Sequence, residues 1–247
     1  MKVSIVIPVY NEGATVGELL HQVWEQPLEL EKEMVIVESN SSDGSRDIVK
    51  KFAQEKDALA PGSVKLVLQE RPRGKGSAMR EGFAHATGDI ILIQDADLEY
   101  DVKDYPAVLA PIVEGKTAFV LGSRHLSAGS WKIRKFEGAF IKAQFMNLGG
   151  ALFHGYFNIL FGTHLTDPTT MFKVFRRDCL EHFTLKANRF DFDFELLGKL
   201  IRAGYPPLEV PISYVSRGFE EGKKVRIFRD PPMWMWMILK TRFTPLR

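Results

Sequence analysis

Three acidic residues follow a short apolar run near the middle of the chain. Asp95, Asp97 and Glu99 alternate directly after Ile90–Ile93. A run of this kind is typical of a buried parallel strand, and open α/β sheets bind ligands at the carboxyl ends of their strands. Carboxylate oxygens suit Mg²⁺ or Mn²⁺, which usually complete their coordination with substrate phosphates. The stretch therefore predicts a divalent-metal diphosphate site, and the alternative is a solvated acidic turn.

Two basic residues are candidates to bind the phosphates of such a ligand. Lys75 stands between Gly74 and Gly76, where glycine lets the backbone approach a phosphate and lysine supplies the charge. Arg124 follows an apolar run and can bind a diphosphate through two parallel hydrogen bonds. Lys75 could instead be a solvated loop lysine. Neither the Walker A spacing nor the dinucleotide-binding glycine pattern is present.

These side chains meet only if the elements before them form one sheet. Short apolar segments alternate with amphipathic helical segments, which indicates βαβ units and a parallel sheet. The expected strands are 3–9, 34–37, 64–68, 90–93, 118–121, 171–175 and 208–215. Pro211 indicates that the last strand lies at an edge. The predicted fold class is α/β, a mostly parallel sheet with helices on both faces, and its strand ends should bring Glu12, Glu38, Lys75 and Asp97 to one crevice.

Composition limits the possible partners. The chain has 247 residues, of which 45% are hydrophobic and 26% charged, as in an ordinary globular protein. The net charge of +2 gives no polyanion signature, so nucleic acid is not an expected partner. Cys179 is the single cysteine and fits a reducing compartment. We expect a cytoplasmic protein without a signal peptide or a transmembrane helix.

Two apolar segments are unusual for a protein that acts only on soluble molecules. Segment 138–162 carries Lys142 as its one charged residue, and segment 233–239 contains two tryptophans and precedes three cations. On a helix, the polar side chains of the first segment fall within about 80° of one another. They are Gln144, Asn147, His154 and Asn158. Both segments are predicted to be amphipathic helices in a membrane interface, and the alternative is that they pack on the core.

A basic stretch precedes the second apolar segment. Residues 217–229 include Arg217 and Lys223, together with Gly218 and Gly222. Such a loop could order over an anionic ligand, or it could be a basic surface loop.

Four motifs resemble those of the inverting family 2 glycosyltransferases, which have the GT-A fold. They are Val-Ile-Pro-Val-Tyr-Asn-Glu at 6–12, Gln-Asp-Ala-Asp-Leu-Glu at 94–99, Gly-Ser-Arg at 122–124 and Glu-Gly-Lys-Lys at 221–224. The chain most resembles the polyprenyl-phosphate sugar synthases, the dolichyl-phosphate mannose synthase group, over nearly its whole length. The resemblance implies one catalytic domain, 1–230, with segment 138–162 inserted, and a C-terminal interfacial helix in 231–247.

The resemblance also implies roles for individual residues. Asp95, Asp97 and Glu99 would bind the metal, Mg²⁺ or Mn²⁺. Glu38 stands where the family usually has an aspartate near the nucleoside. The implied nucleotide-sugar site comprises Pro8, Tyr10, Glu12, Glu38, Lys75, Asp95, Ala96, Arg124, Arg217 and Lys223. The residues expected to take part in catalysis are Asp97, Arg124, Asp193 and Arg217.

The implied reaction is inverting transfer of a sugar from a nucleotide diphosphate to a polyprenyl phosphate at the cytoplasmic membrane face. The metal and the cations would stabilise the departing diphosphate. An acceptor phosphate is already anionic and needs no strong base, whereas a hydroxyl acceptor does. Asp193 stands where hydroxyl-acceptor relatives carry a carboxylate, and we expect it to position rather than deprotonate.

Three alternatives compete with this reading. The first is transfer to a saccharide hydroxyl. The second is a non-catalytic subunit that binds nucleotide sugars, against which the set of three acids argues. The third is a sugar-1-phosphate nucleotidyltransferase, whose glycine-rich N-terminal loop is not found here.

Overall fold

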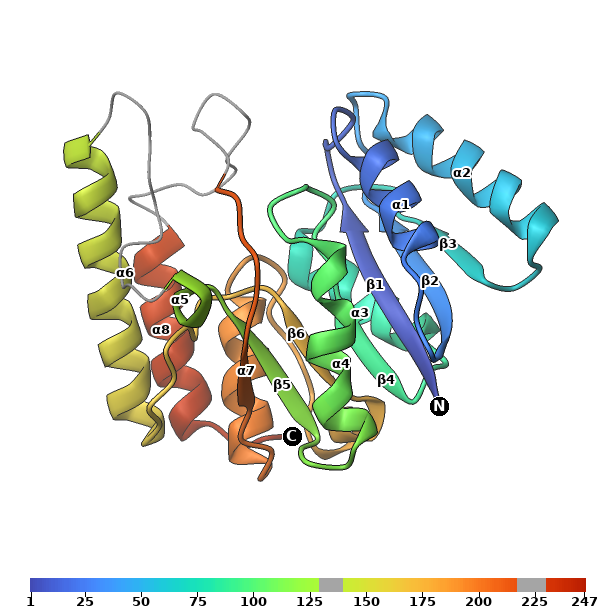
Figure 1. Cartoon of the computed structure of the whole chain (residues 1–247). Helices are drawn as coiled ribbons and strands as arrows, with labels where there is room; N and C mark the ends of the chain where they lie inside the picture. Colours follow the sequence, from blue (N-terminus) through green and yellow to red (C-terminus); the bar gives the residue numbers. More distant parts are fainter. Residues whose placement is uncertain (129–139, 217–229) are drawn as a thin grey trace.

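A computed structural model describes residues 1–128, 140–216 and 230–247. Seven strands form one sheet in the order β3-β2-β1-β4-β6-β5-β7 (Figure 1). Their bounds are β1 Lys2–Val9, β2 Glu31–Glu38, β3 Val64–Leu68, β4 Ile90–Ile93, β5 Phe119–Ser123, β6 Lys173–Arg176 and β7 Leu208–Pro211.

The sheet is mostly parallel, as the repeated strand–helix pattern predicts. Strands β1 to β4 are parallel to their neighbours among themselves, and so are β5 and β7. Strand β6 is antiparallel to both β4 and β5. Strand β7 lies at the edge, as Pro211 indicates. It ends at Pro211, earlier than the predicted 215, because its partner β5 ends at Ser123, which pairs with Pro211.

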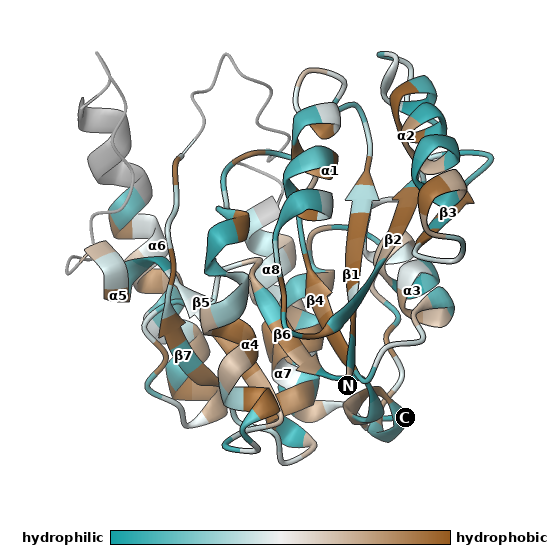
Figure 2. Ribbon diagram, turned by 45° about the vertical axis from the view of Figure 1, so that its right-hand side comes forward, coloured by the Kyte–Doolittle hydropathy of each residue, from teal (hydrophilic) through white to brown (hydrophobic). Residues whose placement is uncertain are grey.

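Helices cover both faces of the sheet. One face carries α1 (Val16–Glu25), α2 (Ser45–Leu59) and α4 (Tyr105–Val113), and the other carries α3 (Lys75–His85), α6 (Phe140–Phe161), α7 (Phe192–Arg202) and α8 (Asp230–Phe243). Short helical turns complete the chain: η1 Val102–Asp104, α5 Arg124–Ala128 and η2 Arg177–His182. Strand β1 shows why two layers form, since Ile5 and Ile7 enter one core and Val6 the other. In Figure 2 β1 is largely hydrophobic, whereas α1 and α2 also carry hydrophilic residues.

The polar stripe of α6 faces the protein rather than solvent. The Asn158 amide donates to Leu165 O at 2.9 Å and accepts from Leu165 N at 2.9 Å, and Asn147 is buried. The outward side is apolar instead, with Leu152 69% and Ile159 83% exposed. The periodicity therefore predicts that this helix has a polar side and an apolar side, but it does not predict which side packs on the rest of the protein.

Helix α8 divides its tryptophans between the core and the surface. The Trp234 ring packs on Phe153 and Phe194, whereas Trp236 is 63% exposed. Core packing, the alternative reading of this segment, therefore applies to one tryptophan of the pair. Within the described residues, no helix is long and apolar enough to cross a bilayer.

A buried carboxylate joins the strands at the edge where β1 begins. Glu33 in β2 is fully buried and accepts hydrogen bonds from Ser4 Oγ at 2.6 Å and Thr87 N at 2.6 Å. Lys2 Nζ and Lys65 Nζ lie 2.8 and 3.0 Å from its Oε2. Burial alone raises the pKa of Glu33, but the hydrogen bonds from Lys2, Ser4 and Thr87 outweigh burial and hold the pKa well below its ordinary range.

Glu33→Gln is expected to lower the free energy of unfolding at pH 7 by about 1–2 kcal/mol, because both lysines stay partly exposed. The folded pKa is below the unfolded one, so the contribution exists above about pH 4.3 and is lost as the pH falls toward the folded pKa. Urea unfolding at several pH values should show that the difference in free energy of unfolding between wild type and variant becomes smaller in acid. Exposed Glu55→Gln is the control, and a gap independent of pH would contradict this assignment.

Candidate active site

Hydrogen bonds join the loops that follow the parallel strands. The Thr15 hydroxyl, after β1, donates to Ala96 O after β4 at 3.0 Å. Gly13 N donates to Asp43 Oδ2 after β2 at 2.8 Å, and an added Cβ at Gly13 would lie 2.8 Å from Asp43 O. Loops from β1, β2 and β4 thus gather at one edge, where the crossover argument places them.

Residues expected to bind the nucleotide occupy this edge in different ways. Pro8 lies in β1 and pairs with Val37 in register, and Tyr10 follows β1 with 40% of its surface exposed. Glu12 caps the start of α1 with its carbonyl, which accepts from Thr15 N and Val16 N. Tyr10 thus has a partly exposed aromatic ring at this edge, and its contact with the nucleotide remains a prediction.

Glu38 is tied to its own turn. It is fully buried at the end of β2, its Oε1 accepts from Ser41 N at 2.6 Å, and its Oε2 accepts from Arg46 Nε at 2.5 Å. These bonds shape the polar turn after β2. A nucleoside that binds the Glu38 carboxylate would have to share its oxygens with Ser41 N and Arg46 Nε. This contact remains a prediction.

Lys75 begins α3 and contacts the acidic loop. Its Nζ lies 2.5 Å from Asp95 Oδ1. The flanking glycines allow close packing against the segment before α7: Gly74 has φ +96°, and a Cβ at Gly76 would clash with Ala187 O. The structure thus gives these glycines a packing role in addition to the phosphate approach that the sequence suggests.

The acidic loop itself contains carboxylates of two kinds. Asp97 is 7% exposed, and its Oδ1 accepts from Glu99 N at 3.1 Å. Glu99 Oε2 accepts from the Tyr214 hydroxyl at 3.1 Å. The side-chain oxygens of Asp95, Asp97 and Glu99 do not all lie within 4.8 Å of one another. The described residues therefore show no preformed three-acid cluster at this loop.

The acidic loop nevertheless fits a hard divalent cation. Mg²⁺ is commonly held by one or two carboxylates, with water and phosphate oxygens as its other ligands. Asp95 already attracts a cationic group, the Lys75 ammonium, and Asp97 is the nearly buried acid two residues further on. Asp95 and Asp97 are therefore the residues that would hold the ion, with Glu99 oriented toward Tyr214.

Behind this loop lies a buried acid that sequence reasoning placed correctly at a helix start. Asp193, in the first turn of α7, is 4% exposed. Burial raises its pKa, against the opposing charges of Lys75 and Lys173. Lys173 is fully buried, its Nζ lies 4.0 Å from Asp193 Oδ1, and burial lowers its pKa to about 8.

Lys173 was not singled out by the sequence reasoning. The available signal is a lysine flanked by Phe172 and Val174 in a segment predicted to be a strand. A charged residue is rarely buried unless it is paired, so a buried acid near Lys173 could be expected. The sequence could not identify Asp193 as that partner, because 20 residues separate the two.

Arg124 forms a buried ion pair that the sequence reasoning also missed. Its Nε and Nη2 lie 2.6 and 2.7 Å from the two oxygens of Asp167, and its guanidinium lies 5.0 Å from the centre of the Tyr214 ring. Burial alone raises the pKa of Asp167, but the charge and hydrogen bonds of Arg124 outweigh it and hold that pKa well below its ordinary range. Arg124 is thus committed to Asp167, and its contact with a diphosphate remains a prediction.

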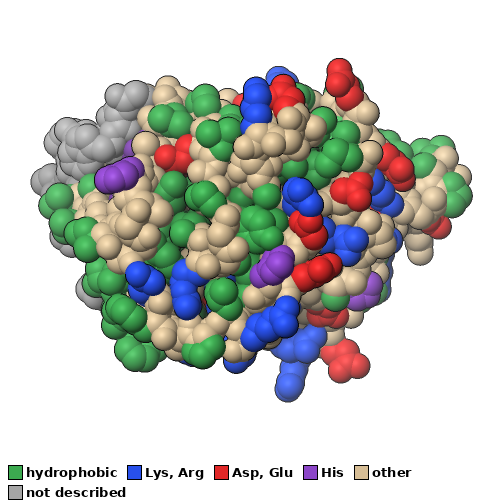
Figure 3. Space-filling view, turned by 90° about the horizontal axis from the view of Figure 1, so that it is seen from below, with side chains coloured by type: hydrophobic (Ala, Val, Ile, Leu, Met, Phe, Trp, Pro, Cys, Tyr) green, Lys and Arg blue, Asp and Glu red, His purple; other side chains and the backbone are tan. Residues whose placement is uncertain are grey.

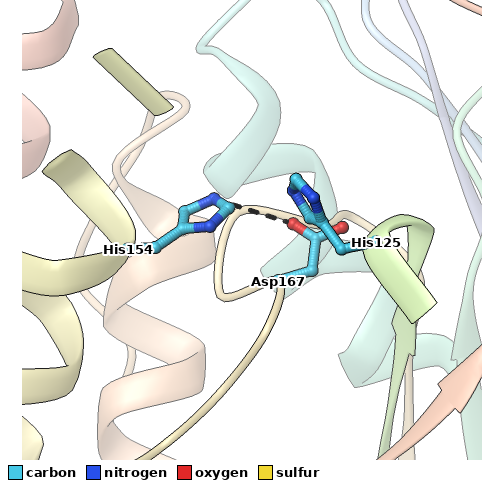
Figure 4. Close-up of side chains that lie close together, drawn as sticks. All are labelled: His125, His154 and Asp167. Carbon is cyan, nitrogen blue, oxygen red and sulfur yellow. Dashed lines mark ion pairs between the residues drawn. The ribbon is translucent and has the colours of Figure 1, made fainter. Parts of the chain in front are cut away.

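Two histidines approach the same carboxylate (Figure 4). The ligand atoms of His125, His154 and Asp167 lie within 4.8 Å of one another. The Asp167 carboxylate already accepts from Arg124 N, Nε and Nη2 and from the Thr169 hydroxyl, which uses its about four acceptor positions. A cation would have to displace these donors beside a guanidinium. We assign the group to an ion-pair network that joins α5, α6 and the loop before β6.

Arg217 and Lys223 lie outside the described residues, so their roles remain predictions.

Figure 3 shows the edge of the molecule opposite to the candidate site, where β1 begins. There acidic and basic side chains are intermixed, without a large patch of one sign.

Solved structures show which class of fold this is. The glucosyl-3-phosphoglycerate synthase from Mycobacterium tuberculosis, solved with Mn²⁺, uridine diphosphate and phosphoglyceric acid, superimposes with a TM-score of 0.68 at 17% identity, covering 99% of this chain and 79% of that one. The mannosyl-3-phosphoglycerate synthase from Rubrobacter xylanophilus gives a TM-score of 0.65 at 18% identity, covering 98% and 73%. The fold is GT-A-like.

Sequence comparison then identifies the family. Residues 4–184 match the Glycosyl transferase family 2 pattern, so the chain belongs to family 2 of the glycosyltransferases. It is 29% identical to a dolichol-phosphate mannosyltransferase of Pyrococcus furiosus over 224 residues, 90% of this chain. It is also 29% identical to an undecaprenyl-phosphate 4-deoxy-4-formamido-L-arabinose transferase of Enterobacter sp. (strain 638) over 226 residues. The chain spans 59% and 62% of the lengths of these relatives.

Proposed function

We propose that this glycosyltransferase moves a sugar from a nucleotide diphosphate to a polyprenyl phosphate at a membrane surface, in a reaction that depends on Mg²⁺ or Mn²⁺. The observation that carries the proposal is an apolar surface on α6 and α8, which an enzyme for soluble acceptors does not need. The names of the two curated relatives, a dolichol-phosphate mannosyltransferase and an undecaprenyl-phosphate 4-deoxy-4-formamido-L-arabinose transferase, agree with it.

The apolar surface comprises exposed residues of two neighbouring helices. The Tyr156 hydroxyl donates to Met235 O at 3.2 Å, and Arg242 Nε donates to Leu160 O at 2.7 Å, so α6 and α8 lie side by side (Figure 1). The members of the surface are Leu148, Leu152, Ile159, Met235, Trp236 and Phe243. Lys240 and Arg242 lie in the last turn of α8, where cations can meet lipid phosphates. We propose a peripheral position on the cytoplasmic membrane face, with 1–230 as the catalytic domain and 231–247 as the interfacial helix.

The proposed chemistry assigns separate tasks to the residues of the site. Asp95 and Asp97 would hold the metal, which would supply positive charge to stabilise the departing diphosphate. Lys75 stands beside them as a further cation for that charge. The acceptor phosphate is ionised at neutral pH, so no strong base has to activate it. The charges of Lys75 and Lys173 both act on Asp193, and we propose that Asp193 holds these two lysines in position.

The function is tested by supplying the full chain with Mn²⁺ or Mg²⁺, short-chain polyprenyl phosphate and a panel of labelled nucleotide sugars. Label that moves into organic solvent with one donor supports the proposal and identifies the sugar. Release of nucleotide diphosphate without labelled lipid would point to a hydroxyl acceptor instead. That outcome would agree with the phosphoglyceric acid bound by the solved synthase.

Leu152→Glu combined with Trp236→Glu is expected to weaken binding to phosphatidylcholine–phosphatidylglycerol vesicles by about tenfold or more, because two apolar side chains are replaced by charges. Vesicle sedimentation measures the bound fraction. Leu59→Glu is the matched control, since Leu59 is 72% exposed but ends α2 on the other face of the sheet. Equal binding of the double variant and the control would contradict the membrane role of the apolar surface.

A further inference from the structure

Four charged side chains of alternating sign extend from the acidic loop to strand β6. Asp95 contacts Lys75, the charge of Asp193 also acts on Lys75, and Asp193 lies 4.0 Å from Lys173. All four belong to different elements: the loop after β4, the start of α3, the first turn of α7 and strand β6. Such a row can shift its pairing without a change of net charge.

One end of the row already holds a cation at the proposed metal position. The Lys75 ammonium lies 2.5 Å from Asp95 Oδ1, a full contact ion pair. The Lys75 side chain is 11% exposed and that of Asp95 19% exposed, so water screens the pair only weakly. A divalent ion that binds Asp95 Oδ1 would take the position of this ammonium and repel it.

The other end offers a position for the displaced ammonium. Asp193 Oδ1 is buried and has no hydrogen-bond partner among the described residues. Lys173 Nζ, 4.0 Å away, is beyond hydrogen-bond distance and donates instead to Thr170 O. A buried carboxylate oxygen without a hydrogen bond costs free energy. A donor that reaches Asp193 Oδ1 would therefore stabilise it.

Lys75 begins α3 beside the start of α7, since a Cβ added to Gly76 would lie 2.7 Å from Phe192 Cβ. Burial lowers the pKa of Lys75, but the charges of Asp95 and then Asp193 outweigh burial and raise it. A lysine side chain carries its point charge on a flexible four-carbon stem, so the ammonium can move while the backbone of α3 stays in place.

We propose that Lys75 changes partner when the metal binds: it neutralises Asp95 in the metal-free chain and moves to Asp193 Oδ1 when a divalent cation occupies Asp95 and Asp97. The inference rests on the proposed metal site. It makes Asp193 a positioning residue, because its carboxylate receives the displaced ammonium and keeps it next to the diphosphate. Each acid in the row then has a cationic neighbour in both states.

The test is Mn²⁺ affinity, measured by titration calorimetry on the full chain without nucleotide. Asp193→Asn is expected to weaken Mn²⁺ binding about tenfold, because Lys75 loses the position it moves to. Lys75→Met is expected to bind Mn²⁺ at least as tightly as wild type. In the Lys75→Met background, Asp193→Asn should change the affinity less than about twofold, since no ammonium remains to be moved.

Asp191→Asn is the matched control for long-range charge. Asp191 is also nearly buried and adjoins the first turn of α7, but its carboxylate accepts from Arg189 N. It should have the same small effect with and without Lys75. An equal effect of Asp193→Asn in both backgrounds would overturn the partner change while leaving the metal site intact.

Failure of the metal site itself gives a different result. If Asp97→Asn binds Mn²⁺ as tightly as wild type, the metal assignment is wrong, and with it the partner change. If Asp193→Asn does not fold, the ¹³C-dimethylated Lys75 resonance can be followed in the wild-type chain during a Mg²⁺ titration. A saturating shift of that resonance supports the partner change, and an unchanged resonance overturns it.

Discussion

Asp97→Asn is expected to lower kcat/KM for sugar transfer about a thousandfold, the scale on which a fixed charge-stabilising group contributes to catalysis. Asp97 is 7% exposed, and Glu99 N donates to its Oδ1, so the substitution replaces an oriented carboxylate by an amide of the same shape. The measurement follows labelled sugar from the donor into lipid extract over a range of Mn²⁺ concentrations.

The size of this loss depends on the carboxylate at that position and not on local charge. Asp101→Asn provides the comparison, since Asp101 lies four positions further on and its carboxylate accepts from Lys103 N at the start of η1. It should keep nearly all activity. Removal of the metal with EDTA should reduce wild type to the level of Asp97→Asn. If Asp97→Asn kept a tenth of wild-type activity in saturating Mn²⁺, the assignment of Asp97 as a metal ligand would be wrong.

The parallel half of the sheet could be predicted because each of its strands is built around a run of apolar residues. Such runs indicate buried strands, and β1, β3 and β4 begin and end within one residue of the predicted bounds, whereas β2 begins at Glu31, three residues before the predicted start. Right-handed crossovers then fix the edge at which the loops meet. For this reason Asp95 and Lys75 could be expected in one place before any contact was known.

Long-range partners could not be predicted in the same way. Asp167 reads as part of a polar turn and Tyr214 as part of a strand, yet both contact Arg124. Glu38 has the character of a ligand residue in the sequence, but Arg46 and the turn after β2 occupy its oxygens. Periodicity specifies faces and ends of elements, whereas the pairing of buried charges depends on which elements meet.

Asp167→Asn is expected to destabilise the fold by about 3–5 kcal/mol, because it leaves the Arg124 guanidinium buried without its counter-charge. Asp167 is fully buried and Arg124 is 7% exposed. Since the folded pKa of Asp167 is lower than the unfolded value of about 3.9, the contribution is present above that pH and is lost as the pH falls toward the folded pKa. Urea unfolding at neutral and acidic pH measures both effects.

Two comparisons separate the ion pair from a general effect of lost charge. Asp178→Asn removes an acid paired with Arg176 at the surface, where both side chains are about half exposed, and should cost less than about 0.5 kcal/mol. Arg124→Met combined with Asp167→Asn should recover part of the stability lost by Asp167→Asn alone, since no unpaired charge is left inside. If the double variant were instead less stable than Asp167→Asn alone, Arg124 would stabilise the fold through its packing on Tyr214 rather than through its ion pair with Asp167.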